Sequence, residues 1–124
     1  MTEANFQNAE KLLGRWLNTN PETRGISECT VARDGDSIKV SITGVGEDGP
    51  IHWPEVRATP LANVEEEAGQ RTMALLATFE LGFMRAETHI RINKGVFVIV
   101  LFVTFLDHSG RANYLNREFF YRQS

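Results

Sequence analysis

Leu13-Gly14-Arg15-Trp16-Leu17-Asn18 opens a series of eight short β-like runs that fill the rest of the 124-residue chain. The later runs lie near residues 25–33, 37–44, 51–58, 70–80, 84–92, 96–106 and 113–122. In the run at 37–44, apolar Ile38, Val40 and Ile42 alternate with polar residues, which is typical of a strand with one wet face. The links are too short for crossover helices, so consecutive strands must be antiparallel. The sequence predicts an all-β fold, an eight-stranded antiparallel up-and-down (meander) barrel without open sheet edges.

The links between the runs carry turn-forming residues, mostly glycine, proline, asparagine and aspartate. Proline cannot donate to a ladder, so Trp53 and Pro54 predict that the run at 51–58 is short or bulged. The longest link, residues 59–69, could close over one mouth of the barrel, and whether it is a lid is left open by the sequence. Before the first run, the spacing of apolar residues over 4–12 predicts a short N-terminal helix that plugs one end.

Composition and charge restrict the classes of function. A chain of this length forms one domain, residues 1–124, with a core that needs no disulfide or metal. A net charge of -3 with scattered basic residues argues against nucleic acid as a partner. The longest apolar stretch, 96–106, is too short for a membrane helix, which needs roughly 20 residues. No basic and apolar leader is visible, so we expect a cytoplasmic protein. Cys29 lies in a strand-like run and is predicted to be an inert thiol.

Gly14-Arg15-Trp16, at the head of an eight-strand meander, resembles the start of the calycin barrels, which include lipocalins, fatty-acid-binding proteins and avidins. The resemblance implies that Gly14 and Trp16 are structural and that the tryptophan packs across a closed end. It also implies that an arginine of the last strand, Arg117 or Arg122, lies over the tryptophan ring in a cation-π contact of roughly 0.5–2 kcal/mol. Eight strands fit a lipocalin-like or avidin barrel better than a fatty-acid-binding protein, which has ten.

The resemblance to avidins also concerns Asn18. Avidins place an asparagine two residues after this tryptophan to bind biotin, and Asn18 stands at that spacing. Avidin pockets hold several further tryptophans, whereas Trp53 is the one other tryptophan of this chain. This difference argues against biotin as the ligand.

The run at 84–92 presents Arg85, Glu87, His89 and Arg91 on one face and apolar residues on the other. The favoured arrangement places the apolar set toward the lumen and the charged set in solvent. In the alternative arrangement, the charged set faces inward. His89 and Glu87 are then candidate catalytic residues, because the unperturbed histidine pKa of about 6.5 suits proton transfer.

The run at 96–106 is apolar on both faces. A solvent-facing strand does not have this pattern, and no crossover helix is available to cover its outer face. Since large exposed apolar patches mark interfaces, we predict a homodimer through this strand. The alternative is that the N-terminal segment or the long link covers it.

The barrel and its surplus aromatic residues predict a cytoplasmic small-molecule binding protein with a hydrophobic ligand in its lumen. The alternatives are a cofactor-free cyclase or isomerase that acts on an apolar substrate, and a non-catalytic dimeric interaction module. No cofactor is implied, and His52 and His108 lack partners at metal-ligand spacing. The candidate ligand-binding residues are Asn18, Trp53, Phe79, Phe102, Arg117 and Tyr121.

Overall fold

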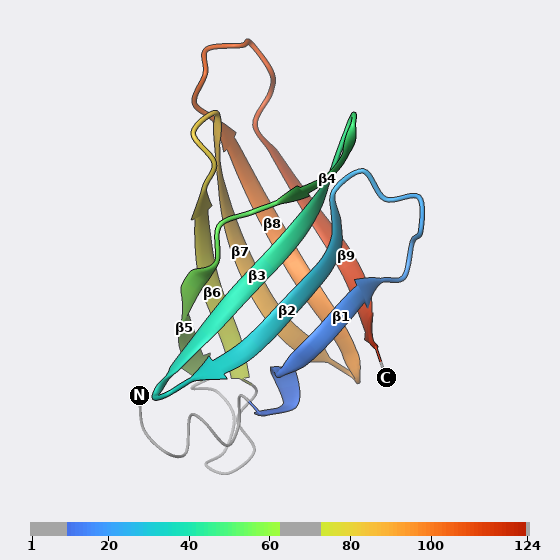
Figure 1. The fold of residues 1–124 in the computed structure, drawn as a ribbon, viewed down its shortest axis with the longest axis vertical. Coiled ribbons are helices and arrows are strands. Elements are labelled where there is room, and N and C mark those ends of the chain that lie inside the picture. The colour runs from blue at the N-terminus through green and yellow to red at the C-terminus, as the bar shows by residue number, and fades with distance from the viewer. Residues whose placement is uncertain (1–9, 63–72, 124) are drawn as a thin grey trace.

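The computed structural model describes residues 10–62 and 73–123, which form a single antiparallel sheet that closes into a barrel (Figure 1). Eight strands form the ring, in the order β1, β2, β3, β5, β6, β7, β8 and β9, and the pairing of β9 with β1 closes it. The predicted eight-stranded up-and-down barrel is therefore confirmed. The elements are η1 (Glu10–Leu12), β1 (Gly14–Asn18), β2 (Ile26–Asp34), β3 (Ser37–Gly46), β4 (Gly49–His52), β5 (Val56–Ala62), β6 (Met73–Glu80), β7 (Met84–Asn93), β8 (Val96–Phe105) and β9 (Tyr114–Arg122).

The N-terminal segment of the described chain is a single 3-10 turn, η1. The predicted short helix spanned residues 4–12, of which 4–9 lie outside the described residues. Leu12 at the end of the turn is 1% exposed, and its carbonyl accepts a hydrogen bond of 2.9 Å from Trp16 Nε1. The described part of the predicted segment is therefore a 3-10 turn and not a helix, and it packs Leu12 at this end of the barrel. Within residues 10–62 and 73–123, no helix has the length and hydropathy needed to cross a bilayer.

The predicted fourth run, residues 51–58, is two strands in the structure, and this part of the prediction is wrong. β4 forms a hairpin with the end of β3, and β5 begins only at Val56. Between them the strand is interrupted at Trp53 and Pro54, although Trp53 N still donates to Ile42 O at 2.9 Å. β5 then continues through Pro60, where it pairs with β6. The longest predicted link, 59–69, therefore begins as strand, and its residues 63–69 lie outside the described part.

The barrel has a packed end and an open end. Near η1, the ring of Trp16 stacks on Phe97 with centroids 4.2 Å apart, and Phe120 meets Phe97 edge-on at 5.8 Å. These large side chains fill the interior there. At the other end, at the top of Figure 1, lie the β1–β2, β6–β7 and β8–β9 loops and the tip of the β3–β4 hairpin. These loops and the hairpin tip surround the end of the barrel opposite η1.

Strands β7 and β8 show which faces line the interior. Along β7, Met84, Ala86, Thr88 and Ile90 are buried, whereas the charged set alternates with them on the outer wall. The favoured arrangement of this run is thus the observed one. Apolar side chains of β8 point both into the barrel and toward its outer wall, where Val96 and Phe102 are 41% and 44% exposed.

Candidate functional site

The closed end of the barrel is held by Gly14, Trp16 and Arg122. The Arg122 guanidinium lies 4.3 Å from the centroid of the Trp16 ring. Its Nη2 donates to Lys11 O at 2.9 Å, and its Nη1 donates to Leu13 O. Gly14 has a φ of +131°, and a Cβ there would come within 2.5 Å of Arg122 Nη1. Arg122, and not Arg117, therefore occupies the position that the calycin resemblance implied.

The open end of the barrel contains a cavity of about 340 Å³. Trp53, Met84 and Leu101, which are at most 8% exposed, are the most buried of its large lining side chains. More exposed apolar residues from the loops and strand ends surround them, namely Val45, Ile51, Leu81, Phe83, Phe105 and Tyr114. We call this space the mouth cavity. Its volume falls within the roughly 300–1,000 Å³ of small-molecule pockets.

Trp53 is fixed in the mouth cavity by contacts on two sides. Its ring packs edge-on against Phe79, with centroids 5.2 Å apart. Gly44 lies beside it, where a Cβ would come within 2.8 Å of Trp53 Nε1. Phe79 itself is fully buried. Trp53 therefore contacts the cavity, whereas Phe79 supports it from the core.

Three charged residues line the rim of the mouth cavity: Arg24, Arg111 and Glu47. Arg111 is held within its own loop, because its Nη2 pairs with Asp107 Oδ2 at 2.7 Å and its guanidinium lies 4.1 Å from the Phe105 centroid. Hydrogen bonds from Ser109 and Arg111 lower the pKa of Asp107, which is therefore negatively charged at neutral pH. Asp107 thus offsets the charge of Arg111.

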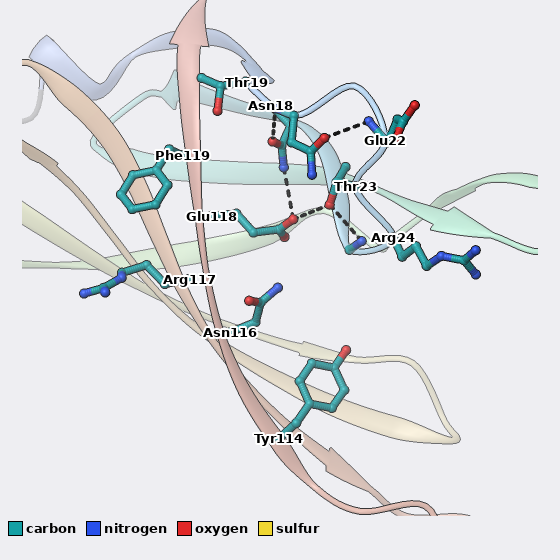
Figure 2. A pocket seen from close by; sticks show the side chains of 12 residues that line it. Asn18, Thr19, Glu22, Thr23, Arg24, Tyr114, Asn116, Arg117, Glu118 and Phe119 are labelled. Carbon is teal, nitrogen blue, oxygen red and sulfur yellow. Dashed lines mark hydrogen bonds between the residues drawn. The ribbon is translucent and has the colours of Figure 1, made fainter.

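Beside the mouth cavity, a polar notch of about 510 Å³ lies between the β1–β2 loop and the start of β9 (Figure 2). Glu118 is 8% exposed and points into this region. Its carboxylate accepts hydrogen bonds from Asn18 Nδ2 at 3.0 Å, from Ile26 N at 2.9 Å and from the Thr23 hydroxyl. One buried carboxylate thus ties the β1–β2 loop to β9 at three points.

Tyr114 lies between the notch and the mouth cavity and lines both. Burial raises the pKa of its hydroxyl, and the negative charge of Glu118 raises it further. The phenol is therefore neutral and can donate a hydrogen bond at physiological pH. Arg24 and Gly25 also line both spaces, so the two hollows adjoin at the β1–β2 loop.

The structure separates the sequence-predicted ligand residues into two groups. Asn18 faces the notch, where its amide donates to Ile26 O at 2.8 Å as well as to Glu118, and Trp53 and Phe79 lie inside the barrel. Phe102, Arg117 and Tyr121 instead lie on the outer wall, with Phe102 44% and Tyr121 52% exposed. The expectation that these three line the lumen is wrong, because strand alternation turns them outward.

The candidate catalytic pair, Glu87 and His89, also lies on the outer wall of β7. His89 borders a shallow outer hollow of about 440 Å³ with Arg91, Arg117 and Phe119. Burial lowers the pKa of His89, and the nearby charge of Arg91 lowers it further. A reaction inside the barrel would have to use other side chains.

Cys29 is fully buried, and burial raises the pKa of its thiol to about 12. A thiol with this pKa is protonated at neutral pH and is a poor nucleophile, in agreement with the prediction. Within residues 10–62 and 73–123, His, Cys, Asp and Glu residues form no group of three that could hold a metal ion.

Glu118 and Arg24 line the hollows at the open end but were not among the site residues predicted from the sequence. For Glu118 a signal was available: if Arg122 covers Trp16, strand alternation turns Glu118 to the interior as well. Arg24 lies in a loop without periodicity, so its position depends on the contacts of the loop.

Comparisons with protein families, with curated proteins and with solved structures gave no match, so the calycin resemblance stays a prediction.

Proposed function

We propose that the protein binds a small, largely apolar molecule in the mouth cavity of its barrel. The observation that carries the proposal is the cavity of about 340 Å³ with Trp53, Met84 and Leu101 among its most buried lining residues. Apolar lining with few polar groups is the usual composition of small-molecule sites. The packed end of the barrel limits the ligand to the open half.

Binding of 1-octanol, a neutral apolar probe, tests this proposal by isothermal titration calorimetry. We expect one site per subunit in the unaltered protein. Leu81→Trp adds an indole beside the cavity and should weaken binding at least about tenfold, a loss of about 1.4 kcal/mol. Leu81 is only half-buried, so the larger side chain has space to fit without breaking the core.

Leu76→Trp is the matched control, because Leu76 lies on the outer wall of β6 and is 41% exposed. It should leave octanol binding unchanged. The proposal fails if the unaltered protein does not bind octanol, or if both variants bind it as well as the unaltered protein does.

A second measurement locates the site. Trp53 lies in the mouth cavity and Trp16 at the packed end, so octanol should alter the fluorescence of Trp53 alone. The response should vanish in Trp53→Phe. A response that persists in this variant would place the probe elsewhere.

A further inference from the structure

We propose that the ligand carries an anionic group and that Arg24 selects it. This inference rests on the proposed binding function and adds the chemical class of the ligand. It concerns an amphipathic organic anion whose apolar part enters the mouth cavity while its charged group stays at the rim.

Arg24 is the rim cation that is available to a ligand. Within the described residues, its side chain makes no hydrogen bond, ion pair or ring contact, although it lines the mouth cavity. Arg111 by contrast is paired with Asp107 at 2.7 Å and also donates to Ser109 at 2.9 Å. A guanidinium without a partner, beside an apolar cavity, is suited to bind a carboxylate or phosphate through paired hydrogen bonds.

The position of Arg24 is set by the anchored loop on which it stands. The preceding residue, Thr23, donates to Glu118 and accepts from Gly25 N at 3.0 Å. A Cβ at Gly25 would come within 2.5 Å of Glu118 Oε2, so the loop backbone lies directly on the carboxylate. Figure 2 shows the Arg24 side chain extending away from Glu118. Glu118 is therefore a positioning residue for Arg24 and does not neutralise it.

Glu47 lines the same cavity with the opposite charge. It stands in the exposed two-residue turn of the β3–β4 hairpin, next to the exposed Asp48, and no described contact directs it to the cavity. The chain is anchored on both sides of Arg24, because the Thr23 hydroxyl donates to Glu118 and Ile26 N donates to Glu118 at 2.9 Å. We therefore assign the charge preference of the site to Arg24.

Three probes with the same eight-carbon chain test the inference: octanoate, 1-octanol and octyltrimethylammonium, each titrated by calorimetry at neutral pH. Because Arg24 is exposed, its bond to a carboxylate is partly screened, and we expect octanoate to bind about tenfold more tightly than octanol. In Arg24→Gln this preference should disappear, while octanol binding stays unchanged. Higher salt should reduce the preference in the unaltered protein.

Arg57→Gln is the matched control, because it removes the same charge from an exposed position on β5, away from the mouth cavity. It should keep the preference for octanoate. Equal binding of octanoate and octanol, tighter binding of the ammonium probe, or an equal loss of preference in Arg57→Gln would each overturn the role of Arg24 without affecting the proposed cavity. Failure of all three probes to bind would overturn the proposed function itself.

Discussion

Gly14 shows how strongly a single residue constrains the closed end of the barrel. Its φ of +131° is unfavourable for any side chain, and a Cβ would come within 2.5 Å of the Arg122 guanidinium. Gly14→Ala should therefore lower the free energy of unfolding by about 1–3 kcal/mol, measured by urea denaturation. Gly35→Ala is the control, since Gly35 also has a positive φ but has nothing within 4 Å. An equal loss at both sites would mean that backbone strain alone matters and that the contact with Arg122 does not.

At the scale of elements, Glu118 connects β9 with the end of β1 and the start of β2. Its carboxylate accepts from Asn18, Thr23 and Ile26, and glutamine cannot accept at all of these positions. Glu118→Gln should lower the free energy of unfolding by about 1–3 kcal/mol in the same assay, because a buried donor is left unpaired. Glu80→Gln removes the negative charge of an exposed partner of Arg85 and should matter much less. Similar losses in the two variants would contradict this account of the anchored loop.

Sequence patterns predicted the elements better than they predicted the site. Short β-like runs bounded by turn formers located seven of the eight ring strands, and alternation was clearest in the runs at 37–44 and 84–92. The division of this run into β4 and β5 was missed, because two short strands separated by Trp53 and Pro54 have the same local pattern as one bulged strand. The faces of β9 were left open because both are mixed in polarity; Glu118 and Phe120 are buried there, whereas Leu115 is 62% exposed. The position of Arg24 depends on contacts across the barrel, such as that of Glu118 with Thr23, which no local sequence pattern indicates.

At the scale of the whole molecule, the outer wall of β8 is the predicted dimer face, and Leu115 of the adjacent β9 extends its apolar surface. Phe102 and Leu115 are neighbours across the two strands and are 44% and 62% exposed. We expect a dimer in light scattering coupled to size-exclusion chromatography, and a monomer for the double variant Phe102→Ser, Leu115→Ser. Leu76→Ser on the outer wall of β6 should stay dimeric. A monomeric unaltered protein would contradict the prediction.

The pairing of β1 with β9 also determines when the barrel can close during synthesis. Glu118 follows Asn18 by 100 residues along the chain, and Trp16 pairs with Arg122 over a similar separation. At roughly 5–20 residues per second, a ribosome needs about 5–20 s to deliver β9 after β1 has emerged. Throughout that interval the nascent sheet has two open edges, and the arginine that covers Trp16 is still missing. The barrel can therefore close only late in synthesis, and this interval is when an unfinished chain is most exposed to chaperones and to aggregation.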